Sequence, residues 1–489
     1  MKHTTTLLTS AFVLAAASSL YAGDYTVTAP VRPSQGFLND YLRKDDPYMA
    51  AWDIGAQVRL RYEVKDNIVI AGAPGSLDFR ATGADVDNSY LLTRVRPRVG
   101  YTGEWFSAMV EGRHSSSTGD DRNPNPESDG PIDLHQAFVT IGNHKEFPVS
   151  LKIGRQELSY GDERLVGAFA WNNIGRTFDA AKLRWQNPWF AADMFTSRLV
   201  VPDDNNFNVS NEYETFSGIY ATTKKVPKQS TDIYFLSRNA NAKSPTLQLG
   251  GLVPTPSARD IYTIGIRGKS NPGDIGNWDY TYELMGQFGH FNDPALPAAT
   301  SSLSHEAYAI FAGGGYTFAD MAMTPRLGLE YNFASGDGNA TDGKHETFEN
   351  LFPTNHKFYG FMDFVSLQNI HNVRLQTSIK PLPRLTVLLE GQFFWLADTS
   401  DNFYAVTGAR RGGIAATPGG TGYGINPTYS SYVGSELDLV VTYAVSPHIT
   451  VEAAYCHFFR GDYVKQSLSG AAFGSKDANY VYVQTNFSF

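Results

Sequence analysis

The sequence predicts an all-β fold: a closed antiparallel transmembrane β-barrel of about eighteen strands, with short turns at one end and long loops at the other. Three observations support this prediction. Apolar and polar residues alternate with a period of two along many segments. Long and short connections alternate along the chain. The chain also ends on an alternating strand that is closed by Phe489.

The composition is consistent with this fold class and excludes several others. The 489 residues are 42% hydrophobic, 13% aromatic and 18% charged, with a net charge of −9, which excludes a disordered chain. A mean hydropathy of −0.28 excludes a bundle of membrane-spanning helices, because each helix needs about 20 apolar residues in a row. The single Cys456 excludes a disulfide framework within the chain and a zinc site built from cysteines. A small buried side chain is the expected role of Cys456.

Both ends of the chain carry export signals. Residues 1–22 combine Lys2, an apolar stretch and Ala22 at a cleavage point, the pattern of a secretory signal peptide; a short buried helix is the alternative. Residues 23–51 would then be a short periplasmic segment, and residues 52–489 the barrel. The final strand resembles the signal by which outer-membrane barrels of Gram-negative bacteria are recognised for assembly, unless it is merely an aromatic strand. We therefore expect export to the outer membrane.

The first expected strand shows the alternation clearly. Leu60 and Tyr62 lie on one face, whereas Arg59, Arg61 and Glu63 lie on the other. An apolar face toward lipid and a polar face toward the lumen is the pattern of a transmembrane β-strand. A soluble β-sandwich would also alternate, so this pattern alone does not decide between the two folds.

The lengths of the connections favour the barrel. Links after even-numbered strands are mostly short, such as Asn187-Pro188 and Ser446-Pro447, whereas links after odd-numbered strands are mostly long, such as 336–369 and 397–431. Two distinguishable ends are typical of a barrel with short periplasmic turns, and only closure leaves no unpaired edge in lipid. About eighteen strands would enclose an aqueous lumen. The expected strands are 52–64, 89–101, 105–114, 133–142, 149–157, 175–186, 189–200, 213–223, 230–238, 259–269, 277–291, 305–317, 326–335, 370–380, 385–396, 432–445, 448–460 and 479–489.

Arginines gather on the polar face of the first three expected strands. In a chain with a net charge of −9, this local excess of positive charge predicts a surface that attracts anions, because guanidinium groups match carboxylates in shape and charge. Alternatively, these arginines pair with acidic residues across the strands, and both roles can hold together. The sector comprises Arg59, Arg61, Arg94, Arg96, Arg98, Glu111 and Arg113.

Two motif clusters resemble the alginate export family of outer-membrane barrels. One contains Gly154-Arg155-Gln156, the run 161–165 (GDERL), Trp171 and the run 176–179 (RTFD). The other contains Ser335-Gly336-Asp337, Phe348, the run 351–357 (LFPTNHK), Tyr359-Gly360 and Asp363. The resemblance extends from about residue 50 to the end. It implies a monomeric, eighteen-stranded channel, through which an anionic polysaccharide diffuses past an arginine-rich, acid-flanked constriction.

The resemblance also implies which residues form the constriction. It places there Arg155, Asp162, Arg164, Arg176 and Asp179, and we add Arg184 to the pore lining. The alternation puts Asp179 on the face of Leu183 and Trp185, so a bulge or the strand start would have to turn Asp179 inward.

The expected function is a passive outer-membrane channel for an anionic, uronate-type polysaccharide or oligosaccharide such as alginate. The alternative within transport is a general porin, or one that takes up a sugar or small anion. An enzyme is not expected, because the sequence contains no G-x-S-x-G or H-E-x-x-H motif. A hydrolytic barrel and an adhesive barrel with a plugged lumen are the alternatives outside transport.

The expected partners are the anionic saccharide, outer-membrane lipid and lipopolysaccharide, and the barrel-assembly machinery. Nucleic acid is not expected, because the chain is acidic and its basic residues point inward. No cofactor and no metal are expected. The run from Asp337 to Gly343 resembles the start of an EF-hand calcium loop. Its Gly343 is at the seventh position of the run, whereas an EF-hand requires glycine at the sixth.

Overall fold

The computed structural model describes residues 36–489 except 69–78, 80–86, 123, 124, 131, 144, 145, 204, 205, 242–245, 249, 250, 254–257, 294–300, 412–421 and 470–474. The expected signal peptide, residues 1–22, lies outside the described residues. Eighteen long strands make the barrel. They are β1 (Trp52–Asp66), β2 (Asn88–Thr102), β3 (Phe106–Thr118), β4 (Asp133–Ile141), β5 (Val149–Gln156), β6 (Phe178–Asn187), β7 (Phe190–Val201), β9 (Glu214–Thr223), β10 (Gln229–Ala240), β13 (Arg259–Ser270), β14 (Trp278–Asn292), β15 (Ser302–Thr317), β16 (Arg326–Ala334), β18 (Ile370–Leu382), β19 (Leu385–Leu396), β20 (Tyr432–Ser446), β21 (Ile449–Arg460) and β22 (Ala478–Ser488).

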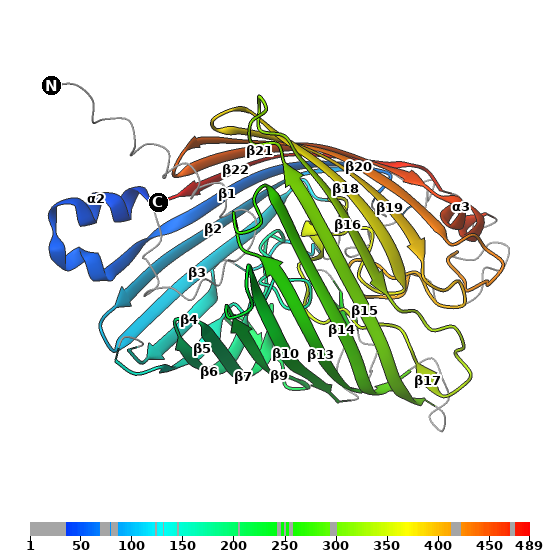
Figure 1. Cartoon of the computed structure of the whole chain (residues 1–489), viewed down its shortest axis with the longest axis horizontal. Helices are drawn as coiled ribbons and strands as arrows, with labels where there is room; N and C mark the ends of the chain where they lie inside the picture. The colour runs from blue at the N-terminus through cyan, green and yellow to red at the C-terminus, as the bar shows by residue number, and fades with distance from the viewer. Residues whose placement is uncertain are drawn as a thin grey trace.

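The barrel is closed by the pairing of its first and last strands (Figure 1). Each of the eighteen strands pairs antiparallel with the neighbours that precede and follow it among these eighteen, and β1 pairs with β22 from Gln57↔Ser488 to Asp66↔Asn479. Each expected strand overlaps one of these strands, so the predicted fold class is confirmed. Four short strands lie in the loops: β8 (Val209–Ser210), β11 (Thr246–Gln248), β12 (Gly251–Val253) and β17 (Lys344–His345).

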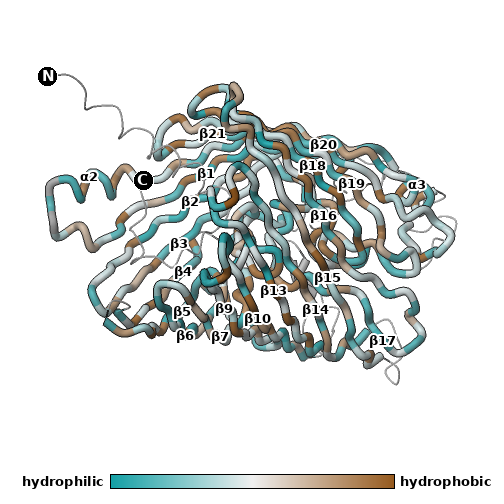
Figure 2. Tube along the Cα trace, viewed as in Figure 1, coloured by the Kyte–Doolittle hydropathy of each residue, from teal (hydrophilic) through white to brown (hydrophobic). Residues whose placement is uncertain are grey.

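The two faces of the wall differ as the alternation predicts. On β1, Leu60 and Tyr62 are 40% and 48% exposed, whereas Arg59, Arg61 and Glu63 are buried on the inner face. Figure 2 shows apolar and polar positions mixed along the same strands. Because lipid offers no hydrogen bonds, the outward face must be apolar and the polar groups must turn inward.

Exposed tryptophans mark the end of the barrel that carries the short turns. Trp105 follows the turn after β2, Trp185 and Trp189 flank the turn between β6 and β7, and Trp278 begins β14. All four side chains are exposed, as expected of an aromatic girdle at a membrane interface. The short turns therefore lie at a membrane interface, as the periplasmic turns of an outer-membrane barrel do.

In the described part of the chain, helical segments are few and lie outside the strands of the wall. Helix α2 (Phe37–Asp45) and the 3₁₀ helix η2 (Pro47–Ala51) precede β1, and α2 lies beside the C-terminus (Figure 1). The side chain of Asn39 fixes α2, donating to Asp53 Oδ1 at 2.6 Å and accepting from the amide of Ile54 at 2.7 Å. The 3₁₀ helix η3 (Asn355–Lys357) and helix α3 (Asp462–Leu468) lie in long loops. Among the described residues, every helix is too short or too polar to cross a membrane.

Two long connections fold back into the barrel. We call residues 157–177, between β5 and β6, the first lumen segment, and residues 335–369, between β16 and β18, the second lumen segment. They meet along a short parallel bridge: the amide of Phe352 donates to Leu165 O, and the amide of Gly167 donates to Phe352 O, both at 2.8 Å.

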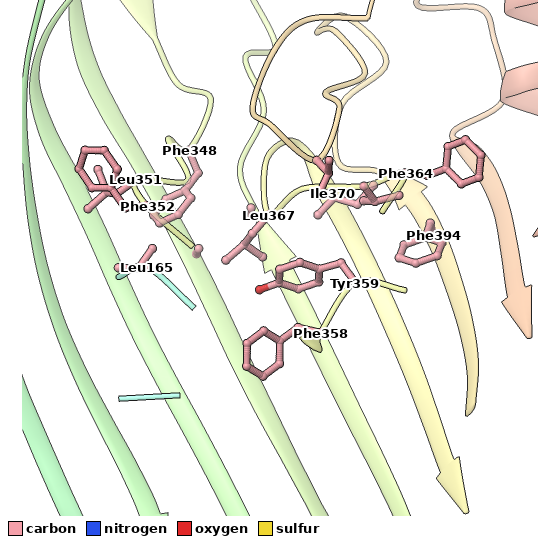
Figure 3. Packing of buried hydrophobic residues seen from close by; sticks show 14 of the residues in the cluster. Leu165, Phe348, Leu351, Phe352, Phe358, Tyr359, Phe364, Leu367, Ile370 and Phe394 are labelled. Atoms are coloured by element: carbon pink, nitrogen blue, oxygen red, sulfur yellow. The ribbon is translucent and has the colours of Figure 1, made fainter. Parts of the chain in front are cut away.

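The lumen segments bring an apolar core inside the barrel (Figure 3). Leu165 from the first segment packs in one cluster with Phe348, Phe352 and Tyr359 from the second, and with Phe394 of β19. Each large apolar side chain removed from water contributes about 1.5–3 kcal/mol to folding, which stabilises the inward position of the segments. The lumen is therefore partly filled by the chain's own loops.

A pair of leucines on β18 tests the orientation in the membrane. Leu375 lies in mid-strand and Leu382 at the turn, and both are at least half exposed. We expect Leu375→Arg to destabilise the barrel by about 2–4 kcal/mol and Leu382→Arg by about 0–1 kcal/mol, because the cost of a charge on the lipid face depends on depth. Denaturant unfolding in lipid vesicles measures both. Equal effects would contradict the assignment of mid-strand positions to the bilayer centre.

Candidate functional site

The expected arginine sector forms on the inner face of β1, β2 and β3. The register places Arg59 opposite Arg94, and Arg98 opposite Glu111. Each side chain in this sector is at least nine-tenths buried. We call this set the arginine cluster: Arg59, Arg61, Arg94, Arg96, Arg98 and Arg113.

Four members of the arginine cluster bind the backbone of the first lumen segment. Arg59 and Arg94 each donate to Ala170 O at 2.9 Å and to Asn172 O at 3.2 and 3.1 Å. Arg61 donates to the carbonyl of Trp171 at 2.8 Å, and Arg113 donates to the carbonyl of Ile174 at 2.9 Å. These guanidinium groups satisfy carbonyl oxygens that have been taken out of water. The arginine cluster therefore holds the segment in place.

Two of these arginines keep an unbalanced charge. The remaining contacts of Arg59 and Arg94 are to the amide oxygens of Asn173 and Gln57, at 3.1 Å each. Among the described residues, neither guanidinium forms an ion pair with a carboxylate. Carbonyl and amide oxygens stabilise a cation without cancelling its charge. The inner wall thus carries two buried positive charges side by side.

The other members of the cluster have acidic partners. Arg61 pairs with Glu63 at 2.6 Å, and Arg98 pairs with Asp53 at 3.1 Å. Arg113 pairs with Asp129 and lies 3.6 Å from Asp133. Glu111 accepts a hydrogen bond from Gln136 at 3.4 Å. The expected cross-strand pairing and the expected local excess of positive charge therefore coexist in this sector.

Glu157 opens the first lumen segment beside Arg96. Its carboxylate lies 3.3 Å from Arg96 Nη1 and 2.9 Å from His135 Nε2. Burial opposes its ionisation, but the hydrogen bond with His135 and the charge of Arg96 prevail and lower the pKa of Glu157 to about 2. Glu157 is thus ionised in the lumen at neutral pH.

An aromatic stack joins the two lumen segments. The guanidinium of Arg61 lies 3.8 Å from the ring centroid of Trp171, and the ring of His356 stacks on Trp171 at 3.8 Å with an interplanar angle of 9°. His356 Nδ1 also lies 3.0 Å from Asp363 Oδ2. Trp171, Tyr359 and Asp363 all belong to the motif clusters of the sequence. The motif residues thus connect the first segment, the second segment and the arginine cluster.

Charged residues of the first segment also bind the opposite wall. Asp162 pairs with Arg267 at 2.6 Å and with Lys269 at 3.2 Å, and these cations overcome the effect of burial to lower the pKa of Asp162 to about 2. Arg164 donates to Glu330 and Asn332 at 2.9 Å each. These contacts place Asp162 and Arg164 inside the lumen.

Arg176 lies at the junction of the two lumen segments. It donates to the carbonyls of Gly167, Phe352 and Pro353 at 3.0, 2.6 and 2.9 Å. Burial lowers the pKa of Arg176 to about 10. Its role is therefore to join the segments, as Arg59 and Arg94 join the first segment to the wall.

Arg155 and Asp179 lie elsewhere than the motif resemblance implied. They are opposite each other in the register of β5 and β6 and form a bidentate ion pair, at 2.9 and 3.1 Å. They share the outward face with Ile153 and Leu183, which are 52% and 38% exposed. Arg155 also donates to Phe207 O at 2.7 Å, so the pair fastens the loop after β7. The placement of these two residues in the constriction is wrong, because no bulge reverses the alternation.

Several lumen-facing lysines were not among the expected pore residues. Lys152 and Lys182 share the inward face of β5 and β6 with Arg184, which pairs with Asp193 at 2.9 Å. Lys269 and Lys357 carry side chains that are each 33% exposed. Lys182 and Arg184 are two residues apart on β6, so the alternation that placed Arg184 inward also predicts an inward Lys182. Lys357 lies in a loop, where the alternation gives no signal, although it ends the motif run 351–357.

The acidic loop after β16 has a structural role in the described residues. Asp337 Oδ1 accepts from the amide of Asn339 at 3.0 Å, and the amide of Asp337 donates to Asp401 Oδ2 at 3.0 Å. Burial, reinforced by the charge of Asp401, raises the pKa of Asp337 to about 6. In the part of the chain that the structure describes, no group of three His, Cys, Asp or Glu side chains is arranged to hold a metal ion.

Comparison with known proteins identifies the family. A family model described as Alginate export matches residues 48–472. The chain belongs to the alginate export family. A search of curated proteins found no match.

Solved structures with the same fold are outer-membrane barrels of Pseudomonas aeruginosa. OccK2 (OpdF) in complex with glucuronate covers 89% of this chain and 98% of its own, with a TM-score of 0.53 and 12% identity. OpdK with vanillate covers 89% and 98%, with a TM-score of 0.52 and 10% identity. OccD3 (OpdP) covers 94% and 99%, with a TM-score of 0.52 and 12% identity. At these identities the likeness shows the fold.

The family and the fold together assign the compartment and the general class. Members of the alginate export family and the barrels with this fold are proteins of the Gram-negative outer membrane, and the chain is an outer-membrane barrel. The same two findings point to a channel rather than to an enzyme. The identity of the solute depends on the residues of the lumen.

Removal of one arginine tests how the first lumen segment is held. We expect Arg94→Ala to loosen residues 165–175, because loss of its hydrogen bonds to the segment leaves buried carbonyl groups poorly satisfied, at about 1–3 kcal/mol. Hydrogen exchange of those amides should accelerate by roughly 5–150-fold. Arg98→Ala is the control, since Arg98 pairs with Asp53. Equal exchange in both variants would show that the segment does not depend on Arg94.

The raised pKa of Asp337 predicts a pH-dependent loop. The loop is closed when Asp337 is buried as in the structure, and open when its side chain is exposed to water. Below a pH of about 4, the usual pKa of an aspartate, Asp337 is neutral in both states. As the pH rises from 4 to 6, the carboxyl group of Asp337 ionises in the open loop before it ionises in the closed loop. The closed loop therefore loses stability until the pH passes the raised pKa of Asp337, about 6. Protection of the amides near Asn339, corrected for intrinsic exchange, should fall between pH 4 and 6. Asp337→Asn should abolish this dependence and Asp342→Asn should retain it; the reverse pattern would assign the titration to Asp342.

Proposed function

We propose that the protein is a passive outer-membrane channel for an anionic, uronate-type polysaccharide or oligosaccharide such as alginate, selected by the arginine cluster of the lumen. The observation that carries the proposal is the pair of buried charges at Arg59 and Arg94, which contact only neutral oxygen atoms. A charge that no carboxylate cancels acts over several ångströms in a confined, low-dielectric lumen. Such a field favours anions over cations along the solute path.

The position of these charges supports a role in selection. They lie on the part of the wall that contacts residues 170–172 of the first lumen segment. A solute that passes the segment therefore moves within reach of their field. A repeating carboxylate along a saccharide chain would meet this field once for every sugar unit, which suits a polymer of uronates.

A second candidate within transport is a channel for small carboxylates or single sugars. Two barrels with this fold were solved with carboxylates, glucuronate in OccK2 and vanillate in OpdK. The same unbalanced charge at Arg59 and Arg94 would attract such solutes. The two candidates differ in the size of the solute, so oligomers of increasing length distinguish them: the polymer channel conducts or is blocked by long oligouronates, and the small-solute channel responds only to monomers and dimers.

Reversal potentials in planar bilayers test the charge directly. We expect the wild-type protein to prefer anions, and Arg59→Gln/Arg94→Gln to lose that preference. The matched control is Arg59→Lys/Arg94→Lys, which also disturbs the carbonyl contacts of the first lumen segment but keeps both charges. Its anion preference should persist.

The outcomes of this test are distinct. A cation preference of the wild-type protein would overturn the proposed function. Equal loss of selectivity in the Gln and Lys variants would show that the fork geometry of the arginines, and not their charge, controls the current. The folded state of each variant is checked by the heat-dependent change in electrophoretic mobility that closed barrels show.

A further inference from the structure

A second group of cations faces the lumen nearer the periplasmic turns. Lys152 on β5 and Lys182 and Arg184 on β6 alternate with outward residues such as Ile153 and Leu183, which are 52% and 38% exposed. The register places Lys152 directly opposite Lys182. None of these three residues belongs to the two motif clusters. The strands β5 and β6 also carry no member of the arginine cluster.

The charges in this group do not balance. Asp193 of β7 serves two cations, with Lys182 Nζ at 3.4 Å and Arg184 Nη1 at 2.9 Å, and it also accepts from the hydroxyl of Tyr160 at 3.2 Å. Lys152 forms no ion pair among the described residues, and its Nζ lies 3.5 Å from the ring centroid of Phe138. Like charges opposite each other on neighbouring strands destabilise a sheet. Lys182 and Arg184 therefore share one carboxylate, which leaves room for a further anion beside them.

Water reaches Lys182 and Arg184 more readily than it reaches the arginine cluster. The side chains of Lys182 and Arg184 are 15% and 20% exposed, whereas those of Arg61 and Arg94 are 0% and 3% exposed. The arginines are also committed to the carbonyls of the first lumen segment. A solute can displace water from a half-buried ammonium group, but it would have to displace the protein backbone from Arg59 or Arg94. Direct contact with a solute is thus favoured at the lysines.

We propose that Lys152, Lys182 and Arg184 form a binding station for a carboxylate group of the transported saccharide, at the periplasmic half of the lumen. This inference rests on the proposed function and adds to it the site of contact. A carboxylate between Lys152 and Lys182 would relieve their repulsion while Asp193 stays with Arg184. An ammonium group binds without the fixed fork geometry of arginine, so the contact forms and breaks easily as the chain moves on.

The station is tested by block of the ionic current in planar bilayers. The probe is an oligouronate of about five sugar units, and the comparison is a neutral oligosaccharide of the same length. We expect the concentration for half-block by the oligouronate to rise about tenfold in Lys152→Gln/Lys182→Gln, since two charge-assisted contacts are lost. Block by the neutral saccharide should not change. Lys152→Arg/Lys182→Arg should retain block by the oligouronate.

The control variant is Lys344→Gln, which removes one positive charge from an exposed loop lysine that pairs with Glu306 at 2.7 Å and is matched to Lys152→Gln alone. It should leave the half-block concentration unchanged. If the wild-type channel is blocked and the double Gln variant is blocked equally well, the station is overturned and the proposed function stands. If the oligouronate does not block the wild-type channel, the station is overturned, and the proposed function is decided by the reversal potentials. If the double variant does not fold, Lys152→Gln alone decides in the same way. In that variant we expect the half-block concentration of the oligouronate to rise about threefold.

Discussion

The lack of hydrogen-bond partners in lipid is the constraint from which the rest of the structure follows. Every backbone N–H and C=O group of the wall must find a partner, so the sheet closes through β1 and β22. Closure of eighteen strands makes an interior too wide for wall side chains alone to fill. The two lumen segments occupy part of that space, and they bring carbonyl groups with them. Those carbonyls need donors, and the inner face of β1, β2 and β3 supplies them as guanidinium groups.

Arginine suits this task because one side chain offers several donors and cannot be deprotonated. Arg59 and Arg94 share the carbonyls of Ala170 and Asn172, so they lie close together although their charges repel. A carboxylate would have relieved that repulsion, but it would also have cancelled the charge. Carbonyl oxygens stabilise both guanidinium groups and leave the charge in place. The same contacts therefore hold the first lumen segment and leave in place the positive charge on which the proposed selection of anions rests.

Much of this arrangement could be predicted from the sequence. The alternation gave eighteen strands that all overlap those of the structure, and the same parity placed Arg59, Arg61, Arg94, Arg96 and Arg113 on the inner wall. The errors arose where motif resemblance replaced parity: Arg155 and Asp179 follow the alternation and pair on the outer face. The folding of residues 157–177 into the lumen was not predictable from composition, because an inward and an outward loop have similar composition; only the motif resemblance, which implied that Asp162 and Arg164 lie in the constriction, pointed to it. Its partners, such as Glu330 and Asn332, are more than 160 residues away along the chain.

The distribution of cations divides the lumen into two zones with different physical roles. In the proposed channel, the buried arginines beside the first lumen segment supply a field but few free donors, so they would attract an anion without holding it. Lys182 and Arg184, nearer the periplasmic turns, carry donors that are partly exposed to water. A conducting path needs binding that is favourable enough for a solute to enter and weak enough for it to leave. In the proposed channel, the arginines would attract a polyanion and the second group of cations would contact it. Attraction would favour entry of the polyanion. Each weak contact with one carboxylate could be replaced by a contact with the next, so the chain could still leave.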